Sequence, residues 1–404
     1  MSKVSRGRAL ALLTLLVLAT TATHLAVTGL QARAHLESAR SGVRALAPLL
    51  QSGQLDRARA RLRDVQADTR RARALTSGPV WRAAGSLPLL GRTPGTVSDI
   101  ASSADAVLSD ALPLALRALG PLAPGAPSVA APASGDTDRP ALDLPAVAAA
   151  APGLREAERR VQRARDTLAT RPAGLVPGPV ARARREVVDE LDRRLLPVLR
   201  GAATAATAAP ELLGASEPRR YFVALQNTAE ARGGGGLPGV YAVAVADRGR
   251  LRLERVGSDR DLQEPVGAPV RSTQEHTRRY ATFAAGSAWL NANLGPHFPD
   301  AARIWSQLWL RQSGQRVDGV LALDPAVLDH LLTATGPVPL ADGTVLSAGD
   351  AVPLTLSRAY ALHDDHLQRK AFLVGLVPAV LERLQAADVP AASLGRALLS
   401  AVGE

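Results

Sequence analysis

A long apolar run near the N-terminus constrains the fold of this chain more than any other feature. Three basic residues lie within the first eight positions, and the apolar stretch 9–30 that follows, interrupted only by Thr, His24 and Gly29, carries no Asp, Glu, Lys or Arg. A helix rises about 1.5 Å per residue, so such a run crosses the roughly 30 Å hydrocarbon core of a bilayer. Positive charge before the run predicts a cytoplasmic N-terminus and a translocated remainder. We therefore predict a basic tail at 1–8 and a transmembrane signal anchor at 9–30.

A cleaved signal peptide is the competing interpretation of this segment. Leu10–Ala19 has the length of a signal-peptide apolar region, about 7–15 residues, and small residues follow at 20–23. The apolar stretch continues to Leu30, however, and the first charge after it is Arg33, which favours an uncleaved anchor. No later stretch reaches spanning length without charges. The sequence thus predicts a single-pass protein of the cell membrane, with its bulk extracytoplasmic and the lipid bilayer as its first partner.

Composition and charge exclude several classes of protein. With 47% hydrophobic residues and no cysteine, the chain is neither disordered nor a disulfide or cysteine-metal scaffold. Aromatic residues make up only 3%, which predicts a core of Ala, Val and Leu. The net charge of +11 suggests a nucleic-acid-binding protein, but residues 216–404 hold 19 basic and 19 acidic side chains. The surplus lies nearer the anchor, so we predict no nucleic-acid partner and consider attraction to anionic lipid there.

Residues 31–215 carry the pattern of helices. Apolar residues recur every three to four positions within 55–72, 154–168 and 187–199, with arginines on the opposite face of the first segment. We expect these segments to pack as a helical stalk or bundle. The stretch near 120–152 is rich in Pro, Ala and Gly and predicts a long exposed linker.

From residue 216 onward the pattern changes to short strand-like runs mixed with helices. Expected strands are 221–226, 240–246, 250–256 and 318–324, and expected helices are 299–312, 325–335, 350–360 and 368–385. Asp247-Arg248-Gly249, between the second and third strands, suits a tight hairpin. This order predicts an α/β (or α+β) domain with a mixed sheet over 216–404.

A glycine-rich segment between the first two expected strands is the first candidate site. Glu230 and Arg232 precede four consecutive glycines, which are Gly233, Gly234, Gly235 and Gly236. Glycines let the backbone approach a ligand closely, and exposed amides form an anion-binding nest. The segment is not a P-loop, because no Gly-Lys-Ser/Thr follows, and not a dinucleotide fingerprint, because no helix follows. A flexible hairpin loop is the alternative interpretation.

The turn Asp259-Arg260-Asp261 after the third expected strand is the second candidate. Arg260 suits a bidentate grip on phosphate, and the carboxylates suit a hard divalent cation. These three residues are our candidates for catalysis, although the sequence assigns no catalytic residue firmly. A solvated turn with local ion pairs is the alternative.

The helical pair near the C-terminus is the third candidate. It contains Arg358, Tyr360, Asp364, Asp365, Arg369 and Lys370. We include Arg358 and Arg369 among the ligand-binding candidates, and the alternative is a set of surface ion pairs, which contribute little. His363 and His366 flank the acidic pair, but two histidines without further ligands are more often surface residues than a zinc site.

The C-terminal residues also resemble a known family. Three stretches carry the resemblance. The first is Tyr221–Arg232 with the glycines and Pro238-Gly239 after it, and the second is Asn291-Ala-Asn293 with Phe298-Pro299-Asp300. The third is Val317–Pro325, ending at Thr335-Gly-Pro337. Together they resemble the domain-of-unknown-function family numbered 4012. The resemblance covers roughly the C-terminal 190 residues. The anchor and helical stalk also resemble members of this family, which are common in actinobacteria. The family implies no established reaction.

A more distant resemblance connects the domain with the LytR-CpsA-Psr group of single-pass envelope proteins. That group moves glycopolymers from polyprenyl-diphosphate carriers to the cell wall. Its motifs resemble, in order, Arg232, Arg260-Asp261, Asp318 to Val338, Arg358 and Arg369-Lys370. The chain departs from the group at Ser258-Asp259, at Pro337, at Tyr360 and after Arg232, where the usual acidic residue is absent. This last departure argues against metal binding and hence against catalysis.

Three functional hypotheses follow. The first is a membrane-anchored envelope protein whose domain binds a phosphorylated or polyprenyl-linked glycan. In this hypothesis Arg232, Arg260, Arg358 and Arg369 hold phosphate and the loop Gly233–Gly236 closes over it. The second is a Mg²⁺-dependent phosphotransferase that attaches glycopolymers to the cell wall, with Mg²⁺ as its cofactor. The third is a non-catalytic scaffold whose stalk binds envelope protein partners.

Overall fold

The computed structural model describes residues 3–51, 55–88, 91–120, 142–171, 176–263 and 267–385, together with residue 397. Contacts within these ranges divide the chain into two units. One lies within 1–120 and 149–207, and the other within 121–148 and 208–404.

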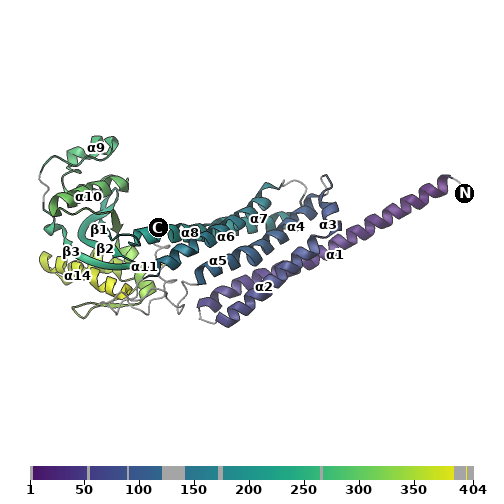
Figure 1. Cartoon of the computed structure of the whole chain (residues 1–404), viewed down its shortest axis with the longest axis horizontal. Coiled ribbons are helices and arrows are strands. Elements are labelled where there is room, and N and C mark those ends of the chain that lie inside the picture. The colour runs from purple at the N-terminus through teal and green to yellow at the C-terminus, as the bar shows by residue number, and fades with distance from the viewer. Residues whose placement is uncertain are drawn as a thin grey trace. The chain divides into compact units, whose positions relative to one another are not determined.

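The first unit is helical. Its helices, wholly or in part, are α1 (Lys3–Gln51), α2 (Leu55–Thr76), α3 (Pro79–Gly85), α4 (Arg92–Asp105), α5 (Leu112–Leu119), α6 (Leu144–Thr170), α7 (Gly178–Glu190) and α8 (Leu196–Leu212). Two π-helical segments, 106–111 and 191–195, join α4 to α5 and α7 to α8. Figure 1 shows the N-terminal part of α1 extending past α3 and α4. The expected helices at 55–72, 154–168 and 187–199 all lie within helical segments.

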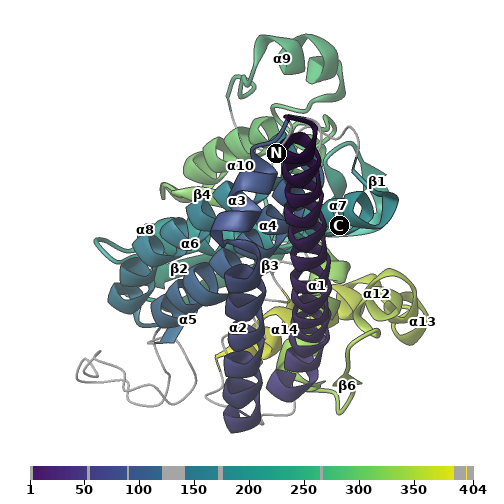
Figure 2. The same ribbon diagram turned by 90° about the vertical axis from the view of Figure 1, so that its right-hand side faces the viewer.

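Small side chains let α1 and α2 pack closely, and Figure 2 shows the two helices side by side. Ala32 and Ala72 are fully buried and join Ala101 of α4 in one cluster. A Cβ atom on Gly42 would lie 2.4 Å from a methyl group of Val65, so only glycine fits there. Alanine combines high helix propensity with little bulk, which explains how an aromatic-poor sequence builds this unit.

α1 contains a candidate membrane span. The segment Leu12–Leu46 is long and apolar enough to cross a membrane, and its apolar window is not buried in the protein. All side chains from Leu12 to Thr20 are exposed. The predicted anchor at 9–30 overlaps this segment, and the side chains of residues 3–11 lie outside the described part of the structure.

The expected linker near 120–152 is shorter than predicted at its C-terminal end. α6 begins at Leu144, so residues 144–152 are helical although Pro145 and Pro152 lie among them. Pro145 occupies the first turn, where the missing amide costs nothing. Four buried apolar side chains, Leu144, Val147, Ala150 and Ala151, stabilise these turns. Residues 121–141 of the predicted linker lie outside the described residues.

The second unit is built on a mixed four-stranded sheet. Its strands are β1 (Arg219–Arg232), β2 (Gly235–Asp247), β3 (Arg250–Ser258) and β4 (Gly319–Leu323), in the order β3-β2-β1-β4. β2 pairs antiparallel with β1 and β3, and β4 lies parallel to β1. The prediction of an α/β domain with a mixed sheet is therefore confirmed. The tight hairpin at Asp247-Arg248-Gly249 is confirmed as well, with Arg248 and Gly249 both at positive φ.

Helices lie on both sides of the sheet, and Figure 1 shows α10 (Phe298–Ser313) on one side and α14 (His366–Leu384) on the other. α11 (Pro325–Thr335) follows β4, and Asp324 caps its N-terminus by accepting hydrogen bonds from the amides of Ala326 and Val327. The remaining elements are α9 (Gln274–Tyr280), the short strands β5 (Val338–Pro339) and β6 (Val345–Leu346), α12 (Ala351–Pro353) and α13 (Ala359–Leu362). The single helix expected at 350–360 is divided by a π-helical segment at 354–358.

The core of this unit differs from the composition-based prediction of Ala, Val and Leu. Five aromatic side chains form its centre, and these are Phe222, Tyr241, Trp289, Trp305 and Trp309. Phe222 stacks on Tyr241 with ring centroids 5.7 Å apart and contacts all three tryptophans. The overall aromatic fraction of 3% concealed this concentration, because eleven of the twelve aromatic residues lie between 221 and 372.

Candidate functional site

The four glycines form a packed hairpin turn and not an open loop. β1 continues to Arg232 and β2 begins at Gly235, so only Gly233 and Gly234 lie between the strands. The Gly234 amide donates to the Asn293 carbonyl at 3.0 Å, and the Asn293 side chain donates to the Gly236 carbonyl at 2.8 Å. A Cβ atom on Gly233 would lie 2.2 Å from the carbonyl oxygen of Leu294. The close approach of this neighbouring segment accounts for the glycines without a ligand.

The residues that flank the glycines have different surroundings. Arg232 is half-buried and donates weakly to the carbonyl of Leu290, at 3.5 Å. Glu230 is exposed and accepts a hydrogen bond from the Asn227 side-chain amide at 3.1 Å. Between Asn227 and Ala231 the pairing with β2 shifts register, which places Glu230 on an irregular segment of the strand.

Asp259, Arg260 and Asp261 form one turn of 3₁₀ helix at the end of β3. Asp261 accepts the amide of Ser258 at 2.7 Å, which completes a capping box. The carboxylate of Asp259 lies 2.6 Å from the Lys370 ammonium group, in an ion pair that is not a well-directed hydrogen bond. Arg260 is exposed and contacts no charged or hydrogen-bonding partner among the described residues.

The arginines of the third candidate are engaged with protein groups. Arg358 forms an ion pair with Asp350 at 2.7 Å. Arg369 lies over the Tyr360 ring, 4.4 Å from its centroid, and donates to the His363 carbonyl at 3.0 Å. Such a cation–π contact holds the guanidinium plane in place.

These contacts join residues from all three candidates at one edge of the sheet. The Asn227 amide also donates to the Tyr360 hydroxyl at 3.1 Å, which links β1 to α13 and, through the Tyr360 ring, to Arg369 on α14. The neighbouring Lys370 donates to the Gly239 carbonyl of β2 and pairs with Asp259 after β3. We call Asn227, Glu230, Asp259, Tyr360, Arg369 and Lys370 the sheet-edge cluster.

The sheet topology explains why these residues meet. Leu225 of β1 pairs in parallel with Leu323, the last residue of β4, and Asn227 follows two residues later on β1. β3 ends at the same level, because its last residue, Ser258, lies opposite Val240 of β2, and Val240 in turn pairs with Leu225. Ligands of α/β sheets commonly bind beyond the carboxyl ends of the parallel strands.

The sequence prediction identified only part of this cluster. Glu230 and Arg369 were among the predicted ligand residues, and Asp259 was a catalytic candidate, whereas Arg232 and Arg358 make no contact with the cluster. Tyr360 and Lys370 belonged to the third candidate segment, but neither they nor Asn227 were among the residues predicted to bind a ligand. An asparagine inside a strand, where that residue is disfavoured, was the available signal for Asn227.

The residues present do not fit a resident Mg²⁺ ion. Asp259 and Asp261, the predicted ligands, contact Lys370 and the Ser258 amide. A cationic ammonium group 2.6 Å from one of the two carboxylates opposes binding of a second cation. Among the described residues, no group of three or more His, Asp or Glu side chains is placed to hold a metal ion.

Comparison with known proteins supports the predicted family. Residues 216–360 match DUF4012, described as a protein of unknown function. These residues form a DUF4012 domain. No curated protein and no solved structure matches the chain, so the resemblance to the LytR-CpsA-Psr group depends on residue order alone. The match ends at Tyr360, so Arg369 and Lys370 of the sheet-edge cluster follow the matched residues.

A buried aspartate stabilises the DUF4012 domain away from the sheet edge. Asp300, in the first turn of α10, accepts hydrogen bonds from the Thr273 amide and hydroxyl, the Ser272 hydroxyl and the His297 ring. Burial alone would raise the pKa of Asp300, but these hydrogen bonds outweigh it and hold the pKa well below its usual value. These hydrogen bonds join the segment before α9 to α10, so we assign Asp300 a structural role.

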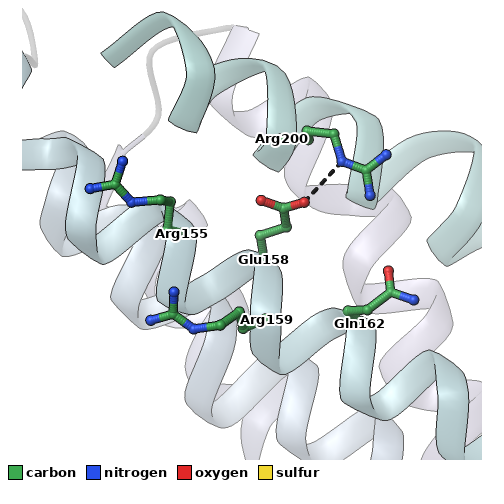
Figure 3. Close-up of a pocket in the computed structure, with 5 residues that line it drawn as sticks. All are labelled: Arg155, Glu158, Arg159, Gln162 and Arg200. Carbon is green, nitrogen blue, oxygen red and sulfur yellow. Dashed lines mark hydrogen bonds and ion pairs between the residues drawn. The ribbon is translucent and has the colours of Figure 1, made fainter. Parts of the chain in front are cut away.

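The helical unit has a charged groove of its own. It encloses about 350 Å³ and is lined by Arg155, Glu158, Arg159, Gln162 and Arg200. Figure 3 shows that these residues come from two neighbouring helices and that Arg200 meets Glu158, at 2.9 Å. Arg155 and Arg159 also have partners, Thr207 and Glu156. Each arginine of the groove has a partner, whereas Arg260 beside the sheet-edge cluster has none among the described residues, so the groove is the weaker candidate for anion binding.

Proposed function

We propose that this chain is a single-pass membrane-anchored protein of the cell envelope whose extracytoplasmic DUF4012 domain binds a phosphorylated or lipid-linked glycan at the sheet-edge cluster. α1 supplies the anchor, residues 31–215 supply a helical stalk, and residues 216–404 supply the binding domain. The observation that carries the proposal is the contact of Arg369, Tyr360 and Asn227, where Asn227 lies on β1 two residues past the level at which β4 ends.

The chemistry of the cluster suits a sugar with an anionic group. Tyr360 is 42% exposed and offers an apolar ring edge beside the amide of Asn227 and the carboxylate of Glu230. Amide and carboxylate groups bind sugar hydroxyls, and guanidinium groups bind phosphate oxygens in pairs. Arg260 is exposed and directly follows Asp259 of the cluster, so it is available for the phosphate.

Binding is better supported than phosphate transfer. The two acids that a Mg²⁺-dependent phosphotransferase needs are already in contact with Lys370 and Ser258. We therefore propose a binding domain and derive no catalytic step.

One observation favours the non-catalytic scaffold as a second candidate. Arg232 and Arg358, two of the four arginines predicted to hold phosphate, bond to protein groups outside the cluster. If the scaffold proposal is correct, substitutions in the cluster leave ligand binding unchanged, and envelope proteins bind to the stalk.

The binding experiment uses the full chain in lipid nanodiscs. Binding of a polyprenyl diphosphate is compared with binding of the uncharged polyprenol of equal chain length. We expect the wild type to prefer the diphosphate. Arg260→Ala should weaken that binding roughly 10- to 100-fold, because a charge-assisted hydrogen bond contributes roughly 1.5–3 kcal/mol. Arg316→Ala is the matched control, since Arg316 is exposed in the same domain and lies just before β4, at the opposite end of that strand.

Two results would reject the binding proposal. One is equal affinity of the wild type for the diphosphate and the alcohol. The other is an Arg260→Ala variant that binds like Arg316→Ala. A Tyr360→Ala variant tests the sugar part, because it should weaken binding of a glycan-bearing diphosphate more than that of the bare lipid.

The membrane orientation is tested separately. The chain has no cysteine, so a single introduced cysteine gives labelling without background. A membrane-impermeant maleimide should label Ala348→Cys, an exposed position of the domain, in intact cells. Ser5→Cys should be labelled only after the cells are lysed. The reverse pattern would contradict the proposed topology.

A further inference from the structure

Trp81 is the only aromatic residue among the first 220 residues, and it packs against the candidate membrane helix. It lies in α3 and is 4% exposed. Its indole N–H donates to the Thr28 hydroxyl at 2.9 Å, and a Cβ atom on Gly29 would lie 3.5 Å from its ring. α3 therefore covers α1 close to the end of the uncharged run.

The length of α1 places this contact at the outer face of a bilayer. Arg8 is the last charged residue before the run. Twenty helical residues, from Ala9 to Thr28, span roughly 30 Å, which equals the thickness of the hydrocarbon core. The level of Thr28 is therefore the level at which the chain leaves the hydrocarbon, and tryptophan is enriched at that boundary in membrane proteins.

Burial along α1 agrees with this level. The side chains from Leu12 to Thr20 are all exposed, whereas Thr21, Leu25 and Thr28 are half-buried and Ala32 is fully buried. These four positions recur at intervals of three to four residues, so they form one face. The rest of the unit thus begins to cover α1 within the last turns of the uncharged run, and the lipid-facing part lies before that.

The outward side of α3 is apolar. Val80 and Leu87 are 37% and 52% exposed, and Ala83 between them is exposed as well. Val80 and Ala83 lie three positions apart on one side of α3, and Leu87 follows in the turn after the helix. Exposed Arg82 adjoins them and has a stem long enough to lie along apolar surface while its charge reaches lipid phosphates. An apolar side with an adjoining basic residue is the pattern of a segment that lies in a membrane interface.

We propose that Pro79–Pro88, which we call the α3 foot, docks on the outer leaflet of the bilayer with Val80 and Leu87 in the boundary between headgroups and acyl chains. The inference rests on the proposed membrane anchoring by α1. We propose that lipid covers this surface, because the exposed apolar part of α1 extends up to the residues that Trp81 contacts. The foot fixes the depth of α1 and gives the stalk a second attachment to the membrane.

The test uses spin labels on single cysteines in the full chain, reconstituted in liposomes. Labels at Val80→Cys and Leu87→Cys report the foot, and a label at Leu16→Cys reports the span. Leu116→Cys is the matched control, because Leu116 is 48% exposed on α5 and comparable with the foot positions. Collisions with oxygen, which concentrates in lipid, are compared with collisions with a water-soluble nickel complex.

We expect the labels at positions 80 and 87 to be less accessible to the nickel complex and more accessible to oxygen than the label at position 116. The label at position 16 should show the accessibilities that are typical of the hydrocarbon core. If 80 and 87 match 116 while 16 lies in the hydrocarbon, the foot proposal is wrong and the anchor stands. If 80 and 87 are shielded from both reagents, a protein covers this surface and the proposal is also wrong. If 16 is open to the nickel complex, the membrane anchor itself fails.

Discussion

The ammonium group of Lys370 lies 2.6 Å from the carboxylate of Asp259, and the two side chains are only 16% and 18% exposed. Lys370 lies on α14 and Asp259 follows β3, so the pair connects the C-terminal helix to the sheet. The chain has only one other lysine, Lys3. Two charges that are so shielded from solvent attract each other strongly. Removing one partner leaves the other charge buried and unpaired, which destabilises the fold.

The first prediction concerns this ion pair. Asp259→Ala leaves the Lys370 charge in a largely buried site and should lower the free energy of unfolding by roughly 2–3 kcal/mol. Lys370→Met should cost a similar amount. The double variant should lose less stability than the sum of the two single losses, because neither charge is then left without its partner. Denaturant unfolding followed by tryptophan fluorescence measures this, and strict additivity would contradict a direct pair.

The second prediction concerns the pH dependence that Asp300 produces. Its pKa is lower in the folded domain than in the unfolded chain, where a carboxyl has a pKa of about 3.9. The stabilisation is therefore fully present above about pH 4 and is lost as the pH falls below that value. The free energy of unfolding should fall more steeply between about pH 4 and pH 2.5 in the wild type than in Asp300→Asn.

A control distinguishes Asp300 from carboxyl groups in general. Asp364 is exposed and contacts no hydrogen-bonding or charged partner among the described residues. Asp364→Asn should reproduce the wild-type pH profile. If Asp300→Asn also reproduces it, the hydrogen bonds to Ser272, Thr273 and His297 do not favour the charged carboxylate.

The third prediction concerns the glycine hairpin. Gly233→Ala places a methyl group 2.2 Å from the Leu294 carbonyl oxygen, so the backbone must shift. We expect a loss of roughly 1–3 kcal/mol in stability, which is typical of overpacking. Gly375→Ala is the control, because Gly375 lies inside α14 with no atom near a new Cβ, and should stabilise the domain by about 0.5–1 kcal/mol. Equal effects of the two variants would contradict the packing explanation.

The fourth prediction concerns Trp81. Trp81→Phe keeps most of the ring but loses the hydrogen bond to Thr28, so the helical unit should lose about 1 kcal/mol. Trp81→Ala leaves a cavity beside Gly29 and should cost roughly 3–5 kcal/mol. Thermal unfolding of the full chain, followed by far-ultraviolet circular dichroism, provides the measurement. A small loss for Trp81→Ala would show that α3 does not hold α1.

Local patterns predicted the four strands of the sheet and the helices α10, α11 and α14, but not α9 or the short strands β5 and β6. A β-branched apolar run located β2, alternating residues located β3, and turn residues located the hairpin at Arg248 and Gly249. Pro325 located the start of α11. These signals were reliable because strand pleat, positive φ and helix capping depend on a few neighbouring residues.

The interpretation of the glycines required the tertiary structure. The sequence shows that Gly233–Gly236 permit a close approach, but it does not show what approaches. The partner is the segment around Asn293, about 60 positions later in the chain, whose side chain reaches the Gly236 carbonyl. Pairings over such distances depend on how the sheet and α10 pack.

The sequence by itself determined the apolar N-terminal helix, the neutral charge of residues 216–404 and the mixed α/β character of that domain, because these follow from composition and short-range periodicity. Only the tertiary structure decided which charges meet. It paired Asp259 with Lys370 and Arg358 with Asp350, and it left Arg260 exposed. An arginine has the same appearance in a sequence whether it is paired or available to a ligand, because its surroundings are set by strands and helices distant in the chain.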